Sequence, residues 1–195
     1  MELTITFTEE VLGTASANPE IHKEFIASKA PDAKSREEEV ESLGVDGVVE
    51  KAITIFPKEN GVPFFWDYQI KGFLKDACSM LRRCDKTKSK NLQAFKKVID
   101  GTIFIKPRKI PIILPEGGVM GECQRPLRGQ TAQGERIALA HSETVPIGSK
   151  IEIEIVCLCK ANESLVKEWL DYGELRGLGQ WRNSGKGSFK YKINK

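Results

Sequence analysis

The chain has 195 residues, of which 40% are hydrophobic and 29% charged, a composition typical of a globular protein rather than a disordered one. Its apolar runs are far shorter than the roughly 20 residues of a membrane span, and the first residues lack the basic and apolar regions of a signal peptide. We therefore expect one cytoplasmic domain over residues 1–195. Residues 1–60 carry 13 acidic and 6 basic side chains, and residues 61–195 carry 14 acidic and 24 basic ones. This asymmetry indicates an anionic partner for the later part, or an ordinary lysine-decorated surface.

The first third of the chain predicts two strands separated by a polar insertion. Residues 3–8 alternate between apolar and threonine side chains, which is typical of a half-buried strand. Residues from about 18 to 50 are polar and glutamate-rich, and we interpret them as an insertion or lid. Residues 52–56 predict a short strand, and the Asn-Gly pair within 58–63 predicts a turn.

The middle of the chain predicts an amphipathic helix over about residues 68–84. Its apolar side chains recur at helical spacing, and they are Ile70, Phe73, Leu74, Ala77, Leu81 and Cys84. Lys71 and Lys75 lie off this stripe. A basic loop at 86–91, a second short helix and a strand at 102–105 follow.

The region from about 115 to 136 is rich in Gly and Pro and predicts a projecting loop or hairpin carrying Arg125, Arg128 and Arg136. A short strand at 137–140, a strand at 150–158, a helix at 163–172 and a strand at 188–193 complete the chain. The order strand, helix, strand, strand, helix, strand predicts a ferredoxin-like (RRM-like) α+β fold, with an antiparallel four-stranded sheet and both helices on one face.

A glycine-rich segment connects the last helix to the last strand. Glycines let a backbone approach a ligand closely, and exposed N–H groups in such loops bind anions. Basic, amide and hydroxyl side chains suit phosphate and sugar, and a tryptophan suits a base. The candidate binding residues are Arg176, Gly177, Gly179, Trp181, Arg182, Asn183, Ser184, Gly185, Lys186 and Gly187.

Two familiar phosphate-binding motifs do not fit this loop. It follows a helix and precedes a strand, the reverse of the dinucleotide-binding fingerprint, and no Gly-Lys-Ser/Thr opens a helix. The simpler interpretation of the loop is a flexible connection whose glycines only permit a tight turn.

A helix followed by GLGxxxxxGxG and a terminal strand resembles the glycine-rich loop of the RAMP superfamily of CRISPR-associated proteins. The segment at 60–83 resembles that superfamily's first-helix motif, with Ile70, Lys71 and Gly72 matching and Lys75 in place of the usual Arg. The first strand followed by VLGTAS and the segment at 143–155 also resemble RAMP segments, in the same order. The most similar members are the backbone subunits of type III effector complexes.

This resemblance implies RNA binding through backbone contacts, by Lys71 and Lys75 on the first helix and by residues 177–187. Arg125, Arg128 and Arg136 are added from charge placement alone. Trp66 to Gln69 replace the usual Pro-Gly-Ser-Ser, and Lys186 stands where a hydrophobic residue is common. By rough position, Asp32 and Asp46 are the candidates for the cleaving aspartate of backbone subunits.

We expect a binding protein rather than an enzyme, with no metal and no cofactor. If the chain is an enzyme, a metal-independent endoribonuclease with His141 as the catalytic candidate fits best, since such chemistry needs a proton acceptor and a nearby cation. His22 lies in the insertion.

Two alternatives to RNA binding remain open. One is a binder of a small or cyclic nucleotide, and the other is a decoy that binds effector subunits, either of which suits counter-defence by a phage. Self-association is also compatible with the sequence, and no membrane partner is expected.

Overall fold

The computed structural model describes residues 1–16, 53–131 and 134–194. The predicted insertion at 18–50, with His22, Asp32 and Asp46, lies outside the described residues. Among those that are described, no helix is long and apolar enough to cross a membrane.

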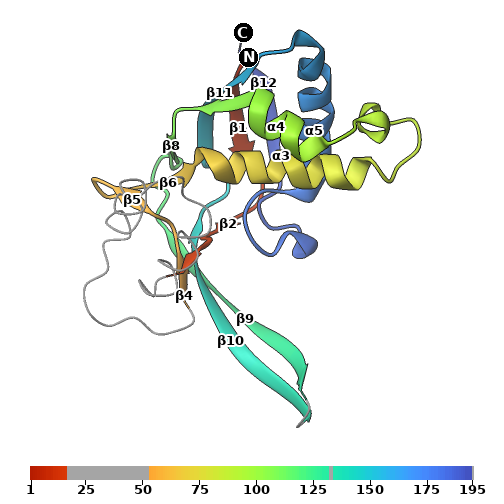
Figure 1. The fold of residues 1–195 in the computed structure, drawn as a ribbon. Helices are drawn as coiled ribbons and strands as arrows, with labels where there is room; N and C mark the ends of the chain where they lie inside the picture. The colour runs from red at the N-terminus through yellow and green to blue at the C-terminus, as the bar shows by residue number, and fades with distance from the viewer. Residues whose placement is uncertain (17–52, 132–133, 195) are drawn as a thin grey trace, which may run out of the picture.

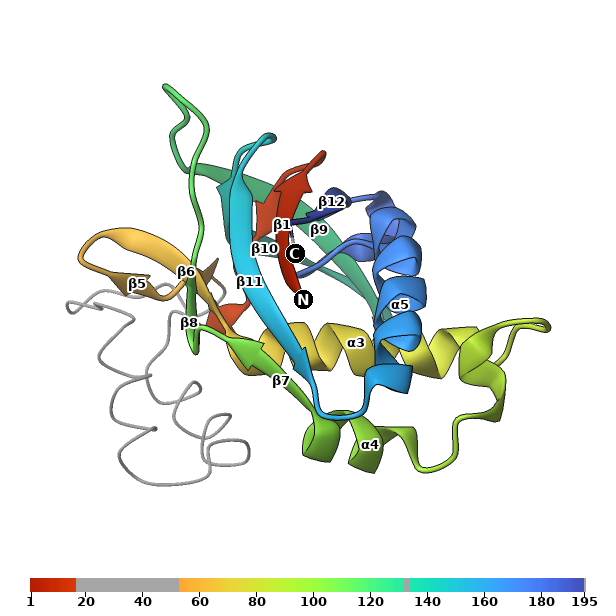
Figure 2. The same ribbon diagram turned by 90° about the horizontal axis from the view of Figure 1, so that it is seen from above.

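A four-stranded antiparallel sheet forms the centre of the fold (Figures 1 and 2). Its strands are β1 (Glu2–Phe7), β7 (Ile103–Lys106), β11 (Lys150–Cys157) and β12 (Phe189–Ile193), in the order β12-β1-β11-β7. Leu3, Ile5 and Phe7 of β1 are buried, as their alternation predicts. The two chain ends meet, since Asn194 donates its backbone N–H to the Glu2 carbonyl at 2.8 Å.

Two helices cover the apolar face of this sheet. Helix α3 (Asp67–Leu81) connects to β7 through α4 (Phe95–Thr102), and α5 (Glu163–Arg176) precedes β12. Ile70, Phe73 and Leu74 of α3 meet Trp169 and Leu170 of α5 in one buried core. The predicted α+β class and its antiparallel sheet with helices on one face are therefore confirmed for the central layer.

The segment before α4 is attached to α5 by a polar network. The Glu168 carboxylate accepts the backbone N–H groups of Lys88 and Ser89 at 2.6 and 3.0 Å. Ser89 Oγ also donates to Glu168 and accepts the Trp169 indole N–H at 2.8 Å. The predicted basic loop at 86–91 thus contains a turn, η1 (Lys88–Asn91), whose first two N–H groups already bind a carboxylate. A second such turn, η2 (Lys160–Asn162), leads into α5.

Two smaller sheets extend the fold beyond the single sheet that the sequence predicts. One contains β5 (Lys58–Glu59), β6 (Val62–Trp66) and β8 (Lys109–Pro111), and the β5–β6 turn has positive φ at Asn60 and Gly61, as an Asn-Gly turn requires. The other contains β2 (Val11–Leu12), β3 (Ala15–Ser16), β4 (Ile53–Ile55) and β10 (Gly134–Val145), and β9 (Gly121–Thr131) pairs with β10.

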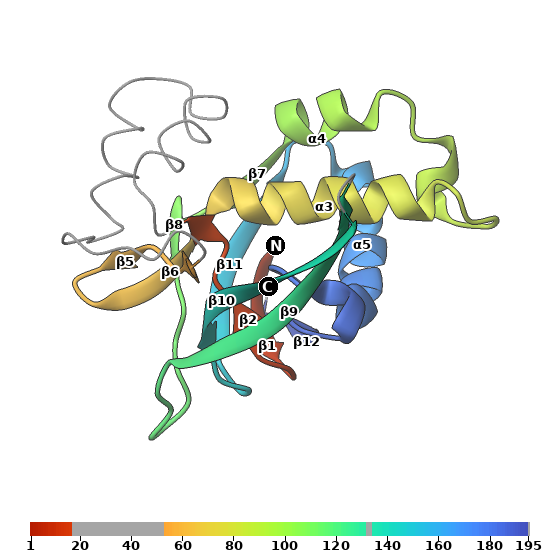
Figure 3. The ribbon, with the colours of Figure 1, turned by 90° about the horizontal axis from the view of Figure 1, so that it is seen from below.

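Strands β9 and β10 form a long hairpin that projects away from the body (Figures 1 and 3). The predicted projection at 115–136 is therefore a hairpin. The short strand predicted at 137–140 is wrong in length, because β10 continues to Val145 and pairs with β2 and β4. Periodicity cannot show this continuation, since one part of β10 projects and the other joins a sheet.

Candidate nucleic-acid interface

The glycine loop is closed at its base by two of its own glycines. Helix α5 ends at Arg176, and Gly177 follows with a φ of 79°. The Leu178 N–H donates to the Gly187 carbonyl at 2.9 Å, and a Cβ on Gly187 would lie 1.8 Å from the Leu178 carbonyl oxygen. These glycines therefore have a structural role, because the two ends of the loop cross at backbone contact.

The loop is also attached to the segment that follows β1. Gly187 donates its N–H to the Glu10 carbonyl at 2.8 Å. Lys186 Nζ donates to Glu10 Oε2 at 2.8 Å, and this hydrogen bond raises the pKa of Lys186 above its usual range. Lys186, predicted from the sequence as a phosphate ligand, is therefore paired with a carboxylate.

Asp76 of α3 organises the two loop arginines. Arg182 Nη1 donates to Asp76 Oδ2 at 2.7 Å, and Arg176 Nε lies 3.8 Å from the same oxygen. Arg176 Nη1 also donates to Asn183 Oδ1 at 2.6 Å. One carboxylate cannot neutralise two guanidinium groups, so this cluster keeps a formal charge of +1.

A polar side chain of the loop stabilises the conformation of the loop itself. Ser184 Oγ donates to the Trp181 carbonyl at 2.9 Å, within the short turn η3 (Arg182–Ser184). Trp181 has a φ of 54°, a left-handed conformation that costs an L-residue about 1–2 kcal/mol. The fold therefore keeps a strained tryptophan at the tip of this turn, where its side chain is 41% exposed. Such strain is often found at functional sites.

Arg125, at the root of the β9–β10 hairpin, lies against the loop. Its guanidinium carbon lies 5.2 Å from the Trp181 ring centroid, and Nη2 donates to Gln180 Oε1 at 3.0 Å. The side chain is only 9% exposed, yet its Nε and Nη1 atoms have no hydrogen-bond partner among the described residues. A buried guanidinium without a carboxylate is costly, and the described residues provide none for Arg125.

The glycine loop borders a shallow groove of about 330 Å³. It is lined by Arg176, Gly179, Gln180, Trp181, Arg182 and Asn183. Arg176 and Arg182, both paired with Asp76, leave a formal net charge of +1 at the groove. Arg125 adds a further positive charge behind it, through its contacts with Gln180 and Trp181. The groove thus combines cations, amide groups and one accessible aromatic ring.

Lys71 and Lys75 lie on a different side of α3, facing α4. Lys75 Nζ pairs with Asp100 Oδ1 at 2.5 Å, and Lys71 Nζ donates to the Asp100 carbonyl at 3.3 Å and lies 4.7 Å from the Phe104 ring centroid. The structure does not bring these lysines into the groove.

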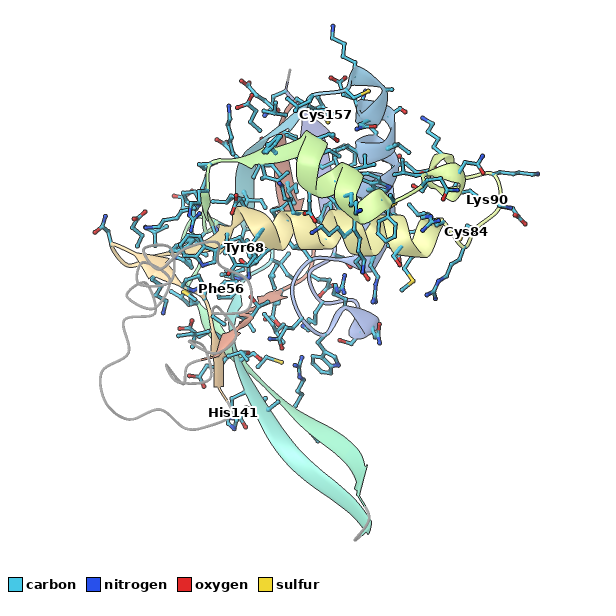
Figure 4. All side chains as sticks on the ribbon, viewed as in Figure 1. Phe56, Tyr68, Cys84, Lys90, His141 and Cys157 are labelled. Carbon is cyan, nitrogen blue, oxygen red and sulfur yellow. The ribbon has the colours of Figure 1, made fainter. Side chains whose placement is uncertain are left out.

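The remaining candidates lie along the hairpin. Arg128 and Arg136 are at register positions opposite Ile137 and Gly129, farther toward the tip than Arg125. His141 lies near the root, opposite Gln124 (Figure 4). Because Arg125 pairs with Ala140 and side chains alternate along strands, His141 and Arg125 occupy opposite faces of the hairpin. The nuclease hypothesis needs a cation near His141, and Arg125 does not provide it.

Sequence reasoning missed Asp76 and Glu10. Each of them meets a loop or hairpin side chain only through tertiary contacts, so no local pattern marks it. The one available signal was the charge of Asp76, which is the sole acidic side chain of α3 after its first residue.

No protein-family model matches the sequence, and no curated protein matches it significantly. Among solved structures, the chain is similar to a protein in the cryo-EM structure of the type III-B Cmr-beta bound to cognate target RNA, with a TM-score of 0.58 and 13% identity. The match covers 98% of this chain and 58% of that one, so this chain spans little more than half of its length.

Two further structures match over nearly the whole chain at lower scores. Cmr6 from Pyrococcus furiosus has a TM-score of 0.48 and 8% identity over 99% of this chain and 97% of that one. A chain of a type IV-B CRISPR complex has a TM-score of 0.47 and 8% identity over 99% and 89%. The structural similarity to RAMP proteins that the motifs predicted is confirmed, as a likeness of fold.

Proposed function

We propose that this protein binds single-stranded RNA along the groove of the glycine loop, beside the hairpin root, either as part of a CRISPR-type assembly or as a phage protein that acts on such an assembly. The observation that carries this proposal is the pairing of Arg125 with Trp181: a buried guanidinium with two unpartnered nitrogens beside an accessible aromatic ring. Phosphate contacts and base stacking are the two components of sequence-tolerant binding to single strands.

The charge distribution supports the same ligand. Arg176, Arg182 and the adjacent Arg125, with Asp76 as the carboxylate that pairs with the first two, carry a formal net charge of +2. Trp181 is 41% exposed, while Trp66 and Trp169 are buried. The likeness of fold to a protein in an RNA-bound complex agrees with this assignment but does not by itself assign a ligand.

The proposal is tested by titrating labelled single-stranded RNA at several salt concentrations. We expect log K to fall linearly with log salt, with a slope of roughly −0.7 per phosphate contact. Quenching of tryptophan fluorescence should accompany binding and should weaken in Trp181→Ala, because Trp181 is the most exposed of the three tryptophans. Trp181→Phe, which keeps an aromatic face, should retain most of the affinity.

Two results would overturn the proposal. One is the absence of binding at low salt. The other is a Trp181→Ala variant that binds as tightly as Trp181→Phe. Lys190→Ala is the matched control. Lys190 is an exposed cation on β12 that pairs with Glu174 of α5, and it does not line the groove.

A further inference from the structure

A pocket separate from the groove lies between α3, the glycine loop and the strands that follow β1. Its volume is about 230 Å³, smaller than the roughly 300–1,000 Å³ of pockets that enclose a drug-sized ligand. Tyr68, at one side of the pocket, lies where β6 meets α3 (Figure 4). A pocket of this size suits a single flat ring system.

Gly72, an exposed residue of α3, is one of the residues that line the pocket. This glycine lies in the first half of α3, where glycine is roughly 0.5–1 kcal/mol less favourable than alanine. A Cβ added to Gly72 would meet no atom within 4 Å, so packing does not require a glycine here. What the missing side chain provides is open space above the helix.

Aromatic rings and hydrogen-bonding groups line the walls. Trp66 and Tyr68 stack with ring centroids 6.2 Å apart and planes inclined by 11°. Gln69 is fixed in place, since it accepts the Trp66 N–H at 2.8 Å and donates to Thr14 Oγ1 at 2.5 Å.

Asp76 provides an acceptor at the pocket's edge. The described contacts of Asp76 with the two loop arginines use Oδ2. Oδ1 is therefore left to accept hydrogen bonds from a ligand, because a carboxylate has acceptor sites on both oxygens.

The pocket and the RNA groove share two of their walls. Gly179 and Arg182 line both. The pocket and the groove therefore adjoin each other at these two residues.

We infer that this pocket receives a single nucleobase, that of one unpaired nucleotide of the strand held in the groove. The inference rests on the proposed RNA binding for its ligand. The base lies over Gly72 beside the aromatic wall, and Asp76 Oδ1 accepts a hydrogen bond from an N–H group on its edge. Base stacking and edge recognition together are the usual means by which proteins hold splayed RNA bases.

The test adds a side chain at position 72. Gly72→Leu adds a bulky side chain at the pocket lining. Leucine is a better helix former than glycine, so the melting temperature should stay unchanged or rise. We expect RNA affinity to fall roughly tenfold, in line with the loss of one stacked base. Gly101→Leu is the matched control, because Gly101 is also helical, in α4, and its Cβ would also meet nothing within 4 Å.

A second measurement separates this inference from the proposed function. Nuclear magnetic resonance compares wild type and Gly72→Leu for binding of the four nucleoside monophosphates and of ribose 5-phosphate, which has no base. We expect at least one nucleoside monophosphate to bind the wild type alone, and ribose 5-phosphate to bind neither.

The outcomes are distinct. If wild type binds RNA but Gly72→Leu behaves like Gly101→Leu, the pocket inference is wrong and RNA binding stands. If a monophosphate binds in a Gly72-dependent way while RNA does not, the base pocket stands and the proposed function falls. If neither RNA nor a monophosphate binds, both are overturned.

Discussion

The guanidinium of Arg125 covers one face of the Trp181 ring, at 5.2 Å from its centroid. One residue comes from the root of the hairpin and the other from the glycine loop, so this contact joins two segments that are far apart in the sequence. It also holds a charged group in a site where no described carboxylate pairs with it. The energetic cost of that arrangement is consistent with a site prepared for an anionic ligand.

Replacement of Arg125 should separate binding from stability. We expect Arg125→Met to bind RNA about tenfold more weakly, as the loss of one charge-assisted contact predicts. Its free energy of unfolding should stay the same or increase, because a buried unpaired charge is removed. RNA titration and urea denaturation measure the two effects. Arg125→Lys should not restore binding, since lysine lacks the planar fork. Equal losses of affinity and stability in Arg125→Met would indicate a purely structural role.

Lys71 and Lys75 should contribute less to RNA binding than Arg125. Asp100 pairs with Lys75 and its carbonyl accepts from Lys71, so a phosphate would have to compete with existing partners. We expect each alanine variant to change RNA affinity by roughly twofold or less, as is typical of exposed ion pairs. A reduction of the salt slope by about 0.7 in either variant would instead show that it contacts a phosphate directly.

Two loop glycines should respond very differently to alanine. Gly187 and Gly185 have similar φ values, 75° and 83°, but a Cβ on Gly187 would lie 1.8 Å from a carbonyl oxygen while one on Gly185 would meet nothing within 4 Å. We expect Gly185→Ala to cost about 1–2 kcal/mol, the penalty of a left-handed residue, and Gly187→Ala to cost clearly more. Chemical denaturation of both variants measures the difference. Equal costs would mean that the loop base adjusts freely.

The Glu168 network should stabilise the segment before α4. Glu168→Gln removes the negative charge that strengthens the hydrogen bonds from the Lys88 and Ser89 N–H groups. We expect the free energy of unfolding to fall by about 1.5–3 kcal/mol. Amide hydrogen exchange at these two residues should become faster. Glu174→Gln is the control, because Glu174 pairs with an exposed lysine, and it should change stability by less than about 1 kcal/mol. Similar effects in both variants would contradict a special role for Glu168.

The sequence predicted the central layer well because local patterns determine it. The alternation of Leu3, Ile5 and Phe7 and the helical spacing of Ile70, Phe73 and Leu74 each correspond to one buried face. The long β10 strand was not predicted, because it begins in a projecting hairpin and ends in a sheet with β2 and β4.

The candidate site was predicted only in part. Arg176, Trp181 and Arg182 do lie together, since one loop carries them. That Asp76 and Glu10 pair with loop cations depends on contacts between distant segments, and the sequence cannot show which cations are already neutralised. The unpartnered nitrogens of Arg125 are visible only once its burial is known.

The crossing of Gly177 and Gly187 has a consequence for engineering. Backbone contacts at Gly177 and Gly187 close the base of the loop. These contacts hold α5 and β12 together without the side chains of the residues between them. Residues 180–185 could then be exchanged for segments of other length or chemistry, with Leu178 and Gly179 kept as the anchored part. The fold would tolerate such grafts, and a library built there would vary ligand preference on a constant scaffold.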